Sequence, residues 1–207
     1  MIKIDHVISG GLEVNCYFIY DSADGKAVVI DPGQDHEDVI KKIELLNLKP
    51  ELLINTHGHF DHIMSDDIIR EKYNIPLAIH KTDAHMLADP FENASTMMGL
   101  SAKIKPAEIL FEKEEERETS FCKYSIIFTP GHTSGSISVL IGGSLFSGDT
   151  LFCGSIGRTD LPGGGNDGEM IKSLDKLKKL DGKIAVYPGH GPSTTIEQEI
   201  LNNPFLR

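Results

Sequence analysis

Several features that define other classes of protein are scarce or absent in this sequence. No apolar run approaches the roughly 18 residues that a membrane-spanning helix needs. The first residues, Met1 to His6, lack the basic region, apolar segment and cleavage site of a secretory signal. The three cysteines, Cys16, Cys122 and Cys153, are too few and too far apart for a disulfide framework or a zinc knuckle. We therefore expect a cytoplasmic protein that does not cross a membrane.

Positive charge is also scarce. The chain has 20 Lys and Arg residues against 31 Asp and Glu residues, which gives a formal net charge of −11. No stripe of Lys and Arg with interleaved aromatic residues is present, so the basic surface that holds a nucleic-acid backbone is missing. We therefore expect no nucleic-acid partner. No feature of the sequence indicates an oligomeric state.

What is present is the composition of an ordinary globular protein. The chain has 207 residues, of which 40% are hydrophobic and 25% charged. This length suffices for one domain with a sizeable core and is too short for two domains of ordinary size. We expect a single domain over residues 1–207, without an internal repeat or a low-complexity linker.

Short apolar runs that end in turns predict a sheet-rich protein with covering helices. Alternating apolar residues predict an antiparallel meander within residues 2–18. Buried strands are predicted at residues 27–30, 52–55, 77–80, 125–128, 137–141, 144–147 and 184–187. Helices are predicted at residues 35–46, 82–87, 168–180 and 195 onward, and another follows a loop after the strand at 52–55 and runs to about residue 70. The helix at 168–180 is expected to bury Ile171, Leu174 and Leu177. Two sheets are implied.

Two segments carry weaker signals. Residues 89–106 include Met97, Met98 and Gly99 and predict a surface loop that borders a site, to which we assign no role. The charged residues 112–118 are expected to form a solvated hairpin tip or sheet edge.

A cluster of histidine and aspartate follows the strand predicted at 52–55. Three imidazoles and one carboxylate occupy six positions, from His57 to His62. Imidazole and carboxylate are side chains that hold first-row divalent metals. The carboxyl end of a strand is also where open α/β layers place their ligands. The segment therefore predicts a metal centre.

Three further segments present ligand-type residues after an apolar run and a glycine. Residues 129–133 contain His132, residues 147–150 contain Asp149, and residues 187–191 contain His190. The glycines allow tight turns, so each side chain can project from the edge of a sheet.

Taken in order, the motifs His-x-His-x-Asp-His, Gly-His, Gly-Asp-Thr and Gly-His resemble the metallo-β-lactamase superfamily over nearly the whole chain. Within it, the chain is similar to short glyoxalase-II-type hydroxyacyl-thioester hydrolases. The resemblance implies an α+β fold, a four-layer αββα sandwich. It also implies two divalent metal ions, for which zinc fits and iron or manganese would also fit. The implied ligands are His57, His59 and His132 for the first ion, Asp61, His62 and His190 for the second, and Asp149 as the bridge.

The activity that the resemblance implies is metal-dependent thioester hydrolysis of the glyoxalase II (hydroxyacylglutathione hydrolase) type. The expected substrate is a small anionic acyl thioester such as S-lactoylglutathione, and the expected nucleophile is a metal-bound hydroxide. Two divalent ions about 3.5 to 4 Å apart can share a hydroxide and polarise a carbonyl. Asp61 and Asp149 are the expected catalytic carboxylates, because both hold metal and Asp61 can also orient the nucleophile.

A second interpretation belongs to another reaction class. Glutathione-persulfide dioxygenases resemble this chain in the same motifs but use one iron, bound by residues matching His57, His132 and Asp149. Lactonase and β-lactamase side activities share the hydrolytic metal chemistry and stay open. A flavodiiron oxygen reductase is disfavoured because that group normally has glutamate at the position of His59. The complete set of seven ligands argues against a non-catalytic binding module.

Substrate selection is predicted to come from residues 154–164. Arg158 can pair with an anion beside the metals, and the alternative is a structural salt bridge to Asp160. In two-domain glyoxalase II enzymes a carboxyl-terminal helical domain supplies much of the glutathione contact. Only 17 residues follow His190, so no separate substrate domain is expected.

The remaining histidines and cysteines are expected to have structural, surface or packing roles. A structural or surface role is predicted for His6, His36, His80 and His85, which have no motif context. Packing roles are favoured for Cys16 and for Cys153, although Cys153 follows Asp149 closely enough to line the site.

Overall fold

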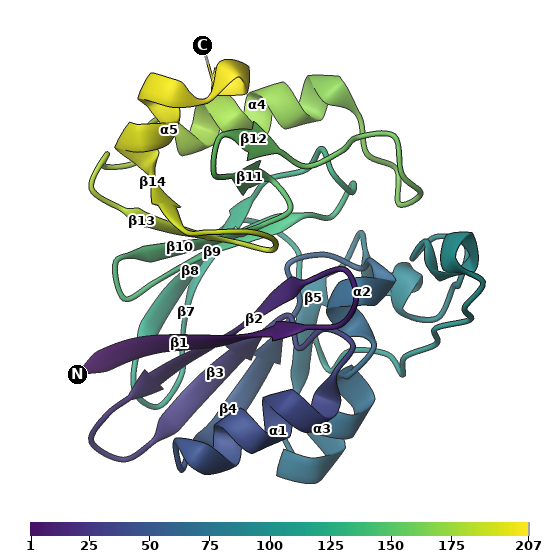
Figure 1. Cartoon of the computed structure of the whole chain (residues 1–207), viewed down its shortest axis with the longest axis vertical. Helices are drawn as coiled ribbons and strands as arrows, with labels where there is room; N and C mark the ends of the chain where they lie inside the picture. Colours follow the sequence, from purple (N-terminus) through teal and green to yellow (C-terminus); the bar gives the residue numbers. More distant parts are fainter. Residues whose placement is uncertain (207) are drawn as a thin grey trace.

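The computed structural model describes residues 1–206 and consists of two six-stranded sheets packed face to face (Figure 1). In the first sheet the antiparallel strands β1, β2 and β3 are followed by β4, β5 and β6, which continue parallel to β3. These strands are β1 (Ile2–Ser9), β2 (Val14–Asp21), β3 (Lys26–Ile30), β4 (Lys49–Ile54), β5 (Leu77–His80) and β6 (Ile109–Phe111).

The second sheet has the order β14-β13-β10-β9-β8-β7, and only the pair β10 and β13 is parallel. Its strands are β7 (Glu115–Glu118), β8 (Lys123–Phe128), β9 (Ile137–Ile141), β10 (Ser144–Gly148), β13 (Ala185–Pro188) and β14 (Thr194–Thr195). A separate small hairpin joins β11 (Leu151–Phe152) to β12 (Ser155–Ile156).

Helices cover the outer face of each sheet (Figure 1). The first sheet is covered by α1 (His36–Leu45) and α3 (Asp66–Tyr73), and the second by α4 (Asp167–Leu177) and α5 (Ile196–Asn202). Shorter helical turns are α2 (Phe60–Ile63), η1 (Ala84–Leu87), η2 (Ser95–Met98) and η3 (Pro204–Leu206). Among the residues described, none of these helices combines the length and the apolarity that crossing a bilayer requires.

Three hydrophobic clusters separate four layers. Strand β3 shows why: Ala27 and Val29 pack toward α1 and α3, while Val28 and Ile30 pack against the second sheet. Alternate residues of a strand point to opposite faces, so a wholly apolar strand is buried on both sides. The third cluster lies between the second sheet and its helices. The predicted αββα sandwich is therefore confirmed.

Some predicted elements differ from the observed ones. The helix expected after the histidine cluster is two helices, α2 and α3, and β6 was not predicted. Helix α4 buries Met170, Leu174 and Leu177, whereas Ile171 is 59% exposed, so the expected burial of Ile171 was wrong. Met170 lies one turn before Leu174 and therefore shares its face. Residues 115–118 form the edge strand β7, as expected for the charge run.

Candidate metal centre

The residues predicted as metal ligands converge at the carboxyl ends of strands from both sheets. Strand β4 leads into the segment from His57 to His62, and β8, β10 and β13 lead to His132, Asp149 and His190. The potential ligand atoms form three overlapping trios, and within each trio they lie within 4.8 Å of one another. The trios are His57, His59 and His132; His57, His62 and Asp149; and Asp61, His62 and His190.

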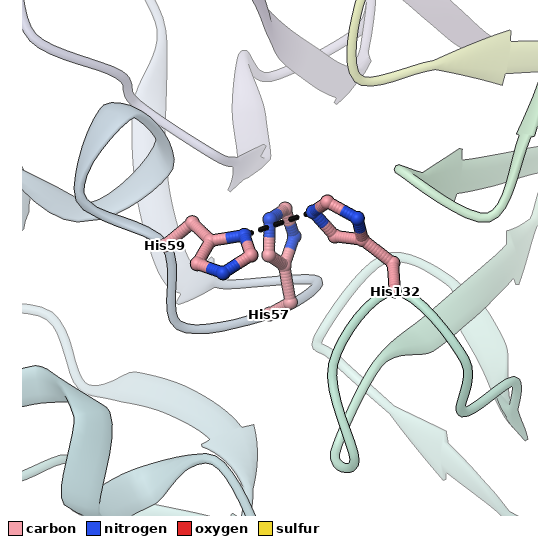
Figure 2. A group of neighbouring side chains, drawn as sticks. All are labelled: His57, His59 and His132. Atoms are coloured by element: carbon pink, nitrogen blue, oxygen red, sulfur yellow. Dashed lines mark hydrogen bonds between the residues drawn. The ribbon is translucent and has the colours of Figure 1, made fainter. Parts of the chain in front are cut away.

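The first trio joins the two sheets. His57 and His59 lie on the loop after β4, and His132 approaches from the loop after β8 (Figure 2). Nδ1 of His59 lies 2.8 Å from Nε2 of His132. Ligand atoms held about 2.1 Å from one ion lie roughly 3 to 4 Å apart, so the 2.8 Å separation lies just below this range and leaves the two nitrogens close enough to share a cation.

The carboxylate of Asp149 lies between the first and the third trio. Its Oδ2 is 3.5 Å from Nε2 of His132 and 3.5 Å from Nε2 of His190. Oδ2 of Asp61 is 3.4 Å from the same Nε2 of His190 and 3.7 Å from Nε2 of His62. Asp149 is therefore placed to contact ions in both trios, which is the geometry that a bridging ligand needs.

Hydrogen bonds to backbone carbonyl groups fix the tautomers of two rings. Nε2 of His59 lies 2.8 Å from the Pro162 carbonyl oxygen, and Nδ1 of His132 lies 2.6 Å from that of Arg158. A carbonyl oxygen only accepts, so both ring nitrogens must carry hydrogen. Burial lowers the pKa of both imidazoles, that of His132 to about 3. In the neutral rings, Nδ1 of His59 and Nε2 of His132 therefore carry lone pairs that face each other. A cation between the two nitrogens would stabilise this arrangement.

Asp31 orients two more of these histidines, His62 by direct contact and His57 through Thr56. Its carboxylate accepts from the Thr56 N–H at 2.8 Å and from the Thr56 hydroxyl at 2.6 Å, and its Oδ2 lies 3.0 Å from Nδ1 of His62. Oγ1 of Thr56 lies 3.1 Å from Nδ1 of His57. Such outer contacts orient metal ligands and set their tautomers. Asp31 holds a φ of 50°, a left-handed conformation that costs a residue with a side chain about 1 kcal/mol.

The electrostatic balance favours a cation. Burial lowers the pKa of His62, but the carboxylates of Asp149 and Asp61 and the contact with Asp31 raise it to about 10. Burial also raises the pKa of Asp149 to about 6, against the lowering effect of His62 and His190. Several carboxylates thus crowd one imidazole in a buried site, where a metal ion would neutralise them.

Buried polar atoms without a hydrogen-bond partner indicate whether these residues could bind a metal ion. Within residues 1–206, Nε2 of His57, Nε2 of His62 and Oδ1 of Asp149 are buried without a hydrogen-bond partner. Leaving such a group unpaired costs roughly 1–3 kcal/mol. The three residues also form one of the donor trios. The cluster can therefore bind metal ions, and its oxygen and nitrogen donors do not distinguish zinc from iron or manganese.

A glycine makes room for this arrangement. A Cβ atom on Gly189 would lie 2.2 Å from Oδ1 of Asp149 and 2.8 Å from Cε1 of His62. Any side chain at this position would displace the cluster, which explains why glycine precedes His190.

The histidine cluster and Asp149 border a cavity of about 380 Å³. Arg158 is among the residues that line it, and its guanidinium forms a bidentate pair with Asp160, at 2.8 and 3.0 Å. The structural salt bridge considered as the alternative for Arg158 is therefore present. Cys153 is exposed, so the packing role favoured for it was wrong, whereas Cys16 is buried in the core as predicted.

The four histidines outside the motifs lie away from the cluster. His80 is buried and stacks on Phe128, with ring centroids 4.5 Å apart. His6 and His85 are exposed and His36 is half-buried. None of the four belongs to a donor trio in the part of the chain that the structure describes.

Comparison with known proteins gives the class that the fold and the cluster define. The family model of the Metallo-beta-lactamase superfamily matches residues 9–190, and the chain belongs to this superfamily. It is 37% identical to the "Probable metallo-hydrolase YqgX" of Bacillus subtilis, over 95% of this chain and 94% of the relative. It is 32% identical to the "Hydroxyacylglutathione hydrolase GloC" of Haemophilus influenzae, over 99% of this chain and 98% of the relative.

Solved structures agree with this assignment. The chain superimposes on the BLEG-1 B3 metallo-beta-lactamase with a TM-score of 0.95 and 38% identity, covering 99% of each chain. It superimposes on TTHA1623, described in a di-iron-bound form, with a TM-score of 0.86 and 32% identity, over 98% of this chain and 100% of that one. Fold, donor cluster and relatives together define a metallo-hydrolase of the superfamily.

Proposed function

We propose that this protein hydrolyses small acyl thioesters at a centre that holds two divalent metal ions. The observation that carries the proposal is the pair of complete donor trios at either side of the Asp149 carboxylate. When bound, two such ions activate water and polarise the carbonyl under attack. Hydrolysis adds water across the C–S bond and yields a carboxylic acid and a thiol.

The chain's own residues have separate tasks in this reaction. His57, His59 and His132 would hold one ion, Asp61, His62 and His190 would hold the other, and Asp149 would be a ligand to both. Five of these seven residues line the cavity, from which the substrate approaches; they are His59, Asp61, His132, Asp149 and His190.

Asp61 also orients the attacking water. Burial raises its pKa, but the neighbouring His62 and His190 outweigh this effect and hold the pKa below its ordinary value. The carboxylate therefore stays ionised at neutral pH and can accept a hydrogen bond from water at the cavity floor.

The thioester class is supported by the relative from Haemophilus influenzae, whose name is that of a hydroxyacylglutathione hydrolase. S-Lactoylglutathione is thus the reference substrate. Arg158 is the cavity residue that we propose to meet an anionic group of the substrate. Zinc is the ion that we propose, and the di-iron-bound form of TTHA1623 makes iron the ion to compare with it.

The second candidate is a persulfide dioxygenase with one iron. One observation favours it: His57 and Asp149 share a donor trio, and Asp149 lies 3.5 Å from His132, so the three ligands of that reaction are also close together. The third trio is the observation against it, because Asp61, His62 and His190 would then hold no ion.

Metal quantification on protein assayed in parallel for both reactions tests the proposal. We expect two metal ions per chain and thiol release from S-lactoylglutathione without oxygen uptake. Asp149→Asn removes a negative charge next to both donor trios, so it should lower metal content and hydrolysis together, the latter by roughly 100-fold. One iron per chain with oxygen consumption on a persulfide would establish the dioxygenase instead. Full activity and two metals in the variant would refute the bridging role.

A further inference from the structure

The walls of the cavity are apolar although its floor is polar. The floor is formed by histidines and aspartates of the candidate metal centre. The walls come from separate segments: η2 supplies Met97 and Met98, the hairpin of β11 and β12 and the loop after it supply Phe152, Ile156 and Leu161, and the turn between β1 and β2 supplies Leu12. In Figure 1 the helical turn η2, which carries both methionines, is the teal segment on the opposite side of the molecule from the N-terminus.

Within residues 1–206, no segment covers Met97 and Met98. The two residues are 62% and 58% exposed, although both are large and apolar. Isolated exposed apolar residues are common, but an exposed pair on the wall of a cavity indicates a surface that a ligand covers. Methionine suits such a surface because its flexible, polarisable side chain adapts to different apolar shapes.

The backbone that carries the methionines is firmly anchored. The Asn93 side-chain amide donates to two backbone carbonyl groups at 3.0 Å each, and the Ala102 N–H donates to Oγ of Ser95 at 3.1 Å. Ala102 also packs in a small apolar cluster with Phe60 and Ala94. The segment therefore folds around a core of its own and still holds Met97 and Met98 outward.

Little positive charge lines this cavity outside the donor cluster. Arg158 is the one cationic side chain among the described residues that line it, apart from the histidines of the cluster. Its guanidinium already binds Asp160, and both side chains are largely exposed, at 65% and 70%. An anionic group would thus meet a cation only at Arg158, while the other side chains outside the donor cluster that line the cavity, the methionines among them, are apolar.

We infer that Met97 and Met98 bind an uncharged apolar chain of the thioester, so that apolar contact adds to the contact of Arg158 in selecting the substrate. The inference rests on the proposed thioester hydrolysis. The apolar chain can belong to the acyl group or to the thiol, since both lie next to the carbonyl under attack. Burying one methylene stabilises a complex by about 0.8 kcal/mol, which corresponds to a roughly three- to fourfold gain in kcat/KM.

Two series of thioesters on the metal-loaded protein test the inference. One series lengthens the acyl group from acetyl to hexanoyl on the neutral thiol N-acetylcysteamine. The other keeps the acetyl group and lengthens an alkanethiol from ethyl to hexyl, with S-acetylglutathione as its charged member. We expect kcat/KM to rise roughly three- to fourfold per methylene in one series, which identifies the half of the substrate that contacts the methionines.

Variants connect this gain to the two residues. Met97→Gln combined with Met98→Gln keeps the side-chain length and removes the apolar surface. The ratio of kcat/KM between substrates that differ by one methylene should therefore fall toward one. Leu45→Gln is the matched control, because Leu45 is an exposed apolar residue at the end of α1 and does not line the cavity. This control should keep the full gain. A flat response in both series, or an equal loss on every substrate in the methionine variant, overturns the inference.

Binding of non-hydrolysable thioether analogues separates this failure from failure of the proposed function. Tighter binding of the longer thioethers, weakened in the methionine variant, with no thioester turned over would refute thioester hydrolysis and support the apolar site. Turnover of thioesters without any dependence on chain length would support thioester hydrolysis and refute the apolar site.

Discussion

At the scale of single residues, the Arg158 guanidinium can pair with either Asp160 or an anionic group of the substrate. Its guanidinium lines the cavity and binds Asp160 through two contacts. Both side chains are largely exposed, and an exposed ion pair stabilises a fold by roughly 0–1 kcal/mol. A substrate carboxylate can therefore replace Asp160 at little cost.

Arg158→Ala should raise KM for S-lactoylglutathione by about threefold to tenfold, because one charge-assisted contact at an exposed site contributes about 1 kcal/mol. A neutral thioester with the same acyl group should change by less than twofold. Steady-state kinetics on both substrates measures the difference. Asp160→Ala is the control, since it frees the guanidinium and should not raise KM for the anionic substrate. Equal changes on both substrates would leave Arg158 with a structural ion pair alone.

The residues of the candidate metal centre could be singled out from the sequence because imidazoles and carboxylates are the side chains that bind divalent metals. Imidazoles and carboxylates after short strands have few other uses as a set, and the structure brings all seven together. Asp31 could not be predicted, because Asp-Pro-Gly after a strand has the same appearance as an ordinary turn. Its role arises from contacts with Thr56 and His62, which lie 25 and 31 positions away.

At the scale of elements, Asp83 joins the two loops that carry the first trio. It precedes η1, and its Oδ2 accepts from the Gly58 N–H at 3.1 Å and from the Thr133 hydroxyl at 2.6 Å. Gly58 lies between His57 and His59, and Thr133 follows His132. One buried carboxylate oxygen thus sets the distance between a loop of the first sheet and a loop of the second.

The charge of Asp83 should make stability depend on pH. Burial raises its pKa to about 6, although the hydrogen bonds from Thr133 and Gly58 lower it. The folded state then binds more protons than the unfolded state between about pH 4 and pH 6. The contribution of this group to stability is therefore greatest below about pH 4 and falls as the pH rises through 6.

Asp83→Asn keeps an acceptor oxygen and removes the charge, so it should flatten this part of the pH profile. Urea unfolding of both proteins from pH 4 to pH 7 measures the effect. We expect the wild type to lose about 1–3 kcal/mol more than the variant over this range. Glu37→Gln, at an exposed position on α1, provides the baseline. Parallel profiles for wild type and Asp83→Asn would contradict the assignment.

Helices and strands could be predicted from the sequence where the run of apolar residues is long enough to show a helical or strand pattern. Strands β3, β4, β9 and β10 follow from short apolar runs that end in turns. Strand β6 has three residues, Ile109–Phe111, next to a charged run, and gives no periodic signal. Residues 89–106 were expected to border the site, and they do, through Ala94, Met97 and Met98. The outward position of the methionines depends on contacts of Asn93 and Ser95 that no local pattern indicates.

At the scale of the whole molecule, the candidate metal centre joins the two halves of the sandwich. His57, His59, Asp61 and His62 come from the first sheet, and the other ligands come from the second. Three buried donor atoms of the cluster have no hydrogen-bond partner in the described chain. Bound ions would both satisfy these atoms and hold the sheets together at this edge.

Removal of the metals should therefore lower the stability of the entire fold. A ligand present at 100 times its dissociation constant stabilises the folded state by about 2.7 kcal/mol. In a chain of this size that corresponds to a fall in Tm of about 5–10 °C on chelation, and excess zinc should restore it. Hydrogen exchange should rise in the ligand loops of both sheets together, because each ion connects them. A chelated protein that is shown to be free of metal and keeps its Tm would mean that packing between the sheets alone holds the two halves in place.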